Sequence, residues 1–220
     1  MLSRQTFSFL SAIAEHNHRE WFQVHKEEYE ESRADILGFT EEVIEKLAAF
    51  DSSIPVDLNP GNCVMRIYRD IRFSKDKTPY KTNYGIAISA TGKNFNGPGY
   101  YIHIKPNESF VAAGLWYPAA AHLKAVRQEI DYNQEEWLNV INAPEFINEF
   151  GTPDPASKLR SAPKGYPSDH PVIEYLKLKS FTAGRKVDDH LLCTPQASAQ
   201  VVGLFQKLYP FMVFLRNAIS

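Results

Sequence analysis

The spacing of apolar residues first changes between residues 51 and 64. Before this segment apolar side chains recur every three or four residues, as in Phe7, Leu10 and Ile13, which is the spacing of an amphipathic helix. After it, short runs alternate apolar and polar residues, which is the spacing of a half-buried strand. The sequence therefore predicts helices followed by a sheet.

Four runs have the alternation and composition expected of strands. They are residues 64–73, 84–90, 100–105 and 110–114. Because their connections are short, we expect antiparallel neighbours: a β-meander of about residues 63–115, packed against N-terminal helices (3–50) and C-terminal helices (118–219). Pro210 should kink or end the last helix. The whole chain, 1–220, is then expected to form one α+β domain.

Positive charge concentrates in the stretch Arg66–Gly85, which we call the cationic motif. It holds six cationic side chains and two carboxylates, a net charge of +4 in a chain whose formal net charge is −2. These residues are Arg66, Arg69, Arg72, Lys75, Lys77, Lys81, Asp70 and Asp76. A cationic island in an acidic chain either binds an external anion or is neutralised by the protein's own carboxylates.

An acidic helical segment is the natural internal counterweight to the cationic motif. Residues 15–51 contain eleven acidic and four basic side chains, a net charge of −7. Such a segment is commonly a solvated helix face. The other interpretation is that part of it packs beside the cationic motif and pairs with its arginines.

In the anion-binding hypothesis, the charged groups of the arginines and lysines surround one phosphate, sulfate or carboxylate group, together with neutral hydrogen-bond donors. An aromatic residue after a strand would then form the roof of a pocket. The ligand-binding residues expected are Arg66, Arg69, Asp70, Arg72, Ser74, Lys75, Lys77, Tyr80, Lys81, His103 and Trp116. The alternative is that the same charges form only internal ion pairs, in a structural or interaction protein.

Two further function classes stay open. An enzyme acting on a phosphorylated or carboxylated substrate could use Asp70, Asp76 and His103, but no nucleophile elbow, phosphate-binding glycine loop or dinucleotide fingerprint is present. The sequence therefore assigns no catalytic residue. Nucleic acid could stack on the tyrosines near the cationic motif, although the acidic total charge makes it a less favoured partner.

The sequence predicts no metal, cofactor or membrane partner. The seven histidines lack compact metal-ligand spacing, and Cys63 and Cys193 are expected to be unlinked thiols. The N-terminus lacks the pattern of a secretory signal, and the most apolar run, Val201 to Leu215, is too short to span a bilayer. We expect a cytoplasmic protein that binds an unknown anionic small molecule. Its oligomeric state does not follow from the sequence.

The chain resembles a conserved family catalogued as domain of unknown function 2461. The resemblance is carried by Arg69–Lys81, by Asn17–Phe22, by Gly99–His103, by Gly114 and Trp116, and by Leu159–His170 around Pro163-Lys164-Gly165-Tyr166. Ala113-Gly114 departs from the paired glycines that are commoner in the family. The resemblance covers nearly the whole length and favours a single domain. It implies no activity, substrate or catalytic residue.

Overall fold

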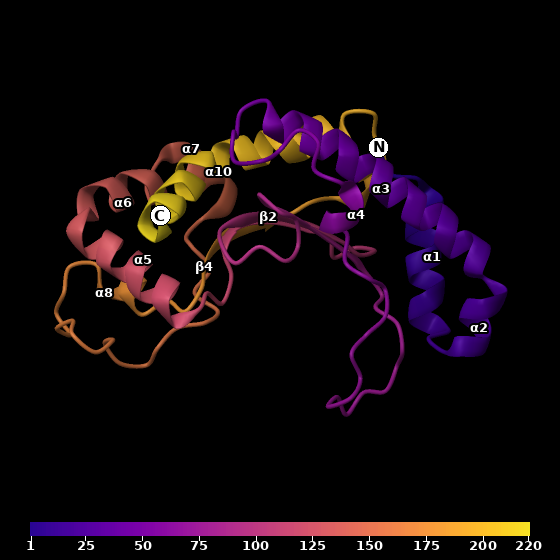
Figure 1. Cartoon of the computed structure of the whole chain (residues 1–220), viewed down its shortest axis with the longest axis horizontal. Coiled ribbons are helices and arrows are strands. Elements are labelled where there is room, and N and C mark those ends of the chain that lie inside the picture. Colours follow the sequence, from indigo (N-terminus) through magenta and orange to yellow (C-terminus); the bar gives the residue numbers. More distant parts are fainter. The chain divides into compact units, whose positions relative to one another are not determined.

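The computed structural model describes all 220 residues and has an α+β fold (Figure 1). Contacts between residues divide the chain into two compact units. Unit 1 consists of Met1–Asn94, Tyr101–Val111 and Lys186–Gly203, and unit 2 consists of Phe95–Tyr100, Ala112–Arg185 and Leu204–Ser220. That the whole chain behaves as one domain therefore stays a prediction.

The sheet has four antiparallel strands in the order β1-β2-β3-β4. The strands are β1 (Tyr84–Ile88), β2 (Gly99–Ile104), β3 (Phe110–Leu115) and β4 (Phe181–Lys186). The first three confirm the predicted meander, and the sequence did not indicate β4. Along β2, Tyr100, Ile102 and Ile104 are buried while Tyr101 and His103 are half-buried, so one face of the strand belongs to the core.

In unit 1, the helices are α1 (Arg4–Glu15), α2 (Arg19–Val24), α3 (Lys26–Ala48), α4 (Pro60–Cys63) and α9 (Asp189–Leu192). Helices α1 and α2 pack on α3, and α3 and α4 contact β1 (Figure 1). The Ser3 hydroxyl accepts the Gln5 N–H, which confirms the predicted start of α1. Helices α2 and α3 are separated by the single residue His25.

In unit 2, the helices are α5 (Ala120–Tyr132), α6 (Gln134–Ile141), α7 (Pro144–Phe150) and α8 (Ile173–Leu176). Trp137 is fully buried against the rings of Phe181, Phe211 and Phe214. Helix α10 (Ala197–Ile219) carries residues of both units and continues past Pro210, so of the two outcomes expected at this proline, a kink or an end, the end does not occur. No helix combines the length and apolar character needed to cross a membrane.

Strands β3 and β4 approach each other unusually closely at Gly114. This residue has φ +133°, a backbone conformation that residues with a side chain rarely adopt. A Cβ atom there would collide with the Phe181 carbonyl oxygen and would lie 2.9 Å from Thr182 Cα. The pairing of these strands therefore requires a glycine.

The strand predicted for residues 64–73 is wrong. The segment between α4 and β1 makes only isolated antiparallel bridges, Val64 with Ile86 and Tyr68 with Tyr80. In Figure 1 it leaves α4 and extends as a long loop before returning to β1. Phe73, the last residue of this predicted strand, is 96% exposed, because no neighbouring strand or helix covers it.

Candidate functional site

Both arginines in the outer part of the cationic motif are paired within the motif itself. Arg72 binds Asp70 through two nitrogens, at 2.9 and 2.6 Å, and these hydrogen bonds hold the pKa of Asp70 below its usual value. Arg69 donates to Asp76 at 2.6 Å and to the Thr78 carbonyl at 3.0 Å. The backbone N–H and hydroxyl of Thr78, and then Arg69, likewise lower the pKa of Asp76.

The acidic segment of residues 15–51 supplies none of these carboxylates. The lysine Lys77 is also engaged, because its Nζ donates to the Ile71 carbonyl at 2.9 Å. The two loop arginines are therefore neutralised from within, as the internal ion-pair interpretation anticipates, whereas Lys77 binds only a neutral carbonyl. Ser74 and Lys75 lie near its tip, where Lys75 is exposed.

The segment that returns from the loop to β1 is fixed at Tyr80 by the side chain of Asn17, which is far away in the sequence. Asn17 Nδ2 donates to the Tyr80 carbonyl, and Asn17 Oδ1 accepts the Tyr80 N–H, both at 3.0 Å. The Tyr80 ring is buried and stacks on Phe22 with 4.2 Å between centroids. Lys81, the next residue, donates its N–H to the Ile67 carbonyl at 2.8 Å. These contacts hold Lys81 in a defined position.

Arg66 and Lys81 line a cavity of about 480 Å³ in unit 1, which we call the cationic cavity. Its polar lining is Arg33, Arg66, Lys81, Lys93 and Asn94, and the rest of its lining is Tyr29, Gly61, Val64, Met65 and Tyr68. Four cations and no carboxylate thus face one space. Its volume is in the range of small-molecule sites.

None of these cations is paired with a carboxylate, and three of them have no hydrogen-bond partner for the side chain either. Arg33, Arg66 and Lys81 make no side-chain hydrogen bond or ion pair, whereas Lys93 donates to the Gly61 carbonyl at 2.9 Å. Burial, and then the positive charge of Arg66, lower the pKa of Lys81. An anion placed in the cavity would reverse the second effect and favour the charged lysine.

Arg33 and Lys93 reach the cavity although neither was among the expected site residues, and the segment of Arg33 was connected with the cationic motif only through its carboxylates. Arg33 lies one helical turn after Tyr29 on α3, so both side chains share a face. Lys93 follows Gly92, whose φ of +79° forms the turn after β1, and the Lys93 N–H donates to the Asn62 carbonyl at 3.0 Å. Only the four-residue spacing of Tyr29 and Arg33 was a usable signal.

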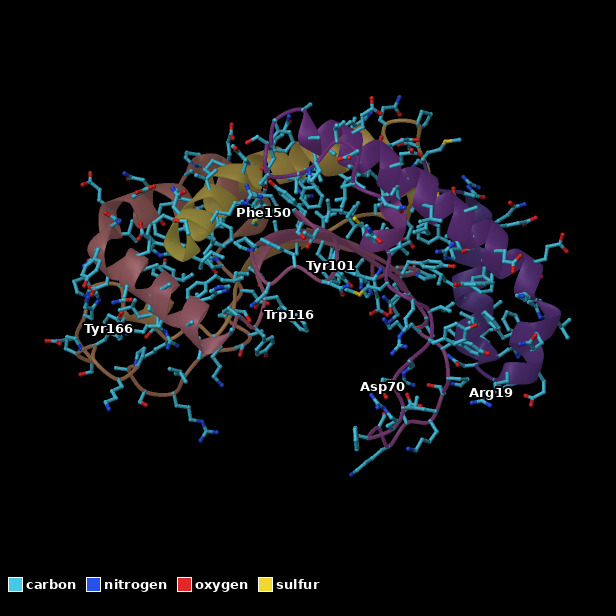
Figure 2. All side chains as sticks on the ribbon, viewed as in Figure 1. Arg19, Asp70, Tyr101, Trp116, Phe150 and Tyr166 are labelled. Atoms are coloured by element: carbon cyan, nitrogen blue, oxygen red, sulfur yellow. The ribbon has the colours of Figure 1, made fainter.

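The remaining expected site residues lie elsewhere. His103 on β2 contacts the Tyr101 hydroxyl at 3.1 Å and stacks on Phe110, and burial followed by the charge of Lys105 lowers its pKa. Figure 2 shows Tyr101 at the sheet and Asp70 out on the loop, so the structure does not bring Asp70 and His103 together. Trp116 belongs to unit 2 and is 75% exposed.

Two other cavities have less suitable linings for an anion. One of about 620 Å³ in unit 2 is lined by Glu135, Glu136 and Glu145, which would repel it. One of about 430 Å³ lies against Arg19 and Glu20 and includes the engaged Lys77. No group of three or more His, Cys, Asp or Glu side chains is arranged to hold a metal ion.

A family model described as "Conserved hypothetical protein (DUF2461)" matches residues 5–214 of the chain. No curated protein and no solved structure shows significant similarity to this chain.

Proposed function

We propose that this chain, which belongs to the DUF2461 family of conserved hypothetical proteins, binds a small molecule bearing a phosphate or carboxylate group in the cationic cavity. One observation carries the proposal. Arg33, Arg66 and Lys81 face the same space without any carboxylate in its lining. Crowded like charges raise the free energy of the empty site, and an anion lowers it.

The chemistry of the lining supports binding rather than catalysis. An enzyme needs a titratable acid or base within hydrogen-bond reach of the ligand. Neither a histidine nor a carboxylate, the side chains used most often as general bases, lines the cationic cavity, and its titratable groups are lysines and tyrosines. An enzyme that acts on a phosphorylated or carboxylated substrate is therefore the second hypothesis, and nucleic-acid binding is the third.

Isothermal titration of the protein with pyrophosphate tests the proposal. We expect saturable binding that Arg33→Ala weakens about 10-fold or more, since a hydrogen bond between charged groups contributes about 1.5–3 kcal/mol. The matched control removes two cations from the loop, Arg72→Ala with Lys75→Ala, and should bind as the unmodified protein does. Binding lost in the loop variant but kept in Arg33→Ala would place the anion on the loop instead. No binding at all would refute the proposed function.

A further inference from the structure

The aromatic side of the cationic cavity distinguishes between classes of anionic ligand. Tyr68 lines the cavity and is 50% exposed. Its ring is nevertheless held in place, 5.6 Å from the Tyr80 ring and 6.1 Å from that of Phe22. An aromatic face that is fixed from behind and open in front is a stacking platform.

A second tyrosine of the lining, Tyr29, packs against the same Phe22 ring. Tyr29 lies 5.1 Å from the Phe22 ring and 6.0 Å from the Phe9 ring, and it lines the cavity together with Tyr68. Burial raises the pKa of Tyr29, so its hydroxyl remains a hydrogen-bond donor at neutral pH. The platform and Tyr29 thus come from one aromatic cluster that packs behind the cavity.

The polar side of the cavity offers more than charge. Asn94 lines it and its amide makes no hydrogen bond within the protein, which leaves one acceptor and two donors for a ligand. A phosphate ion would occupy only part of about 480 Å³ and would leave Tyr68 and Asn94 unused. A larger ligand would contact the cations, the platform and the amide together.

We infer that the ligand is a small phosphate monoester that carries a planar heteroaromatic ring, of which a nucleoside monophosphate is the simplest example. This inference rests on the proposed function. The phosphate binds Arg33, Arg66 and Lys81, the ring stacks on Tyr68, and the Asn94 amide pairs with the edge of the ring. A volume of about 480 Å³ suits a single nucleotide unit better than a strand of nucleic acid.

The test compares AMP, ribose 5-phosphate and a 5′-phosphorylated hexanucleotide by isothermal titration at one salt concentration. AMP should bind about 10-fold more tightly than ribose 5-phosphate, because stacking of one base adds about that factor. Tyr68→Leu should remove this difference and leave the affinity for ribose 5-phosphate unchanged. Tyr132→Leu, an equally simple change of an exposed tyrosine in unit 2, should have no effect.

The outcomes separate this inference from the proposed function. Equal affinity for AMP and ribose 5-phosphate would overturn the inference while leaving anion binding intact, and this comparison needs no variant. A hexanucleotide bound more than 10-fold more tightly than AMP would overturn the small-molecule assignment. If neither monophosphate binds, the inference fails, and absence of pyrophosphate binding as well would refute the proposed function.

Discussion

Replacement of Arg66 and Lys81 together by methionine should reduce pyrophosphate affinity by about 100-fold or more without lowering the stability of the protein. The two changes remove two charged donors, each worth about 1.5–3 kcal/mol when paired with an anion. Neither side chain makes a hydrogen bond or an ion pair within the protein, so their replacement breaks no such interaction. Titration calorimetry measures the affinity and urea denaturation measures the free energy of unfolding.

The sign of the stability change decides between the two interpretations of the cationic motif. Removal of neighbouring like charges should leave the free energy of unfolding unchanged or slightly higher. Arg69→Met is the matched control, because Arg69 does bind Asp76 and Thr78 and its loss should lower stability. A double variant that is several kcal/mol less stable, with its anion affinity unchanged, would show that Arg66 and Lys81 are structural.

Gly114→Ala should destabilise the protein by about 3 kcal/mol or more. The new methyl group would meet the Phe181 carbonyl across the β3–β4 pair, and alanine would also be strained at a φ of +133°. Urea denaturation followed by circular dichroism measures the loss. The close approach explains in physical terms why the glycine that carries part of the family resemblance cannot be replaced by a larger residue.

Gly38→Ala is the control for this effect. Gly38 lies within α3, and an added Cβ would meet nothing within 4 Å. Alanine should therefore stabilise the helix by roughly 0.5–1 kcal/mol. If Gly114→Ala were as stable as the unmodified protein, the described β3–β4 pairing would be incorrect.

Regular elements were predictable where local pattern and packing agree. Strands β1 to β3 follow from alternation and short connections, and each buries every second side chain. The alternation of residues 64–73 looked the same but lacks a partner strand, so Phe73 ends in solvent. Strand β4 gave little signal, because only Phe181 and Ala183 among its six residues are buried.

Tertiary contacts account for what the sequence did not indicate about the site. Asn17 and Glu20 have the spacing of a capping box, but the N-cap of α2 is His18, and the Asn17 amide binds the backbone of Tyr80 instead. Such a contact across 63 positions leaves no local pattern. Arg33 and Lys93 are equally inconspicuous, since neither stands in a local cluster of cations and each acquires a role only beside Arg66 and Lys81.

The proton affinity of Lys81 measures most directly whether an anion occupies the cationic cavity. The side-chain pKa of this lysine can be followed by carbon-13 NMR, with its signal assigned from Lys81→Arg. Without ligand we expect the pKa to lie below that of an ordinary lysine, owing to burial and Arg66. Saturating pyrophosphate should raise it, because a nearby anion favours the charged form. If pyrophosphate binds the protein and the pKa of Lys81 does not change, the anion lies elsewhere and the proposed site is contradicted.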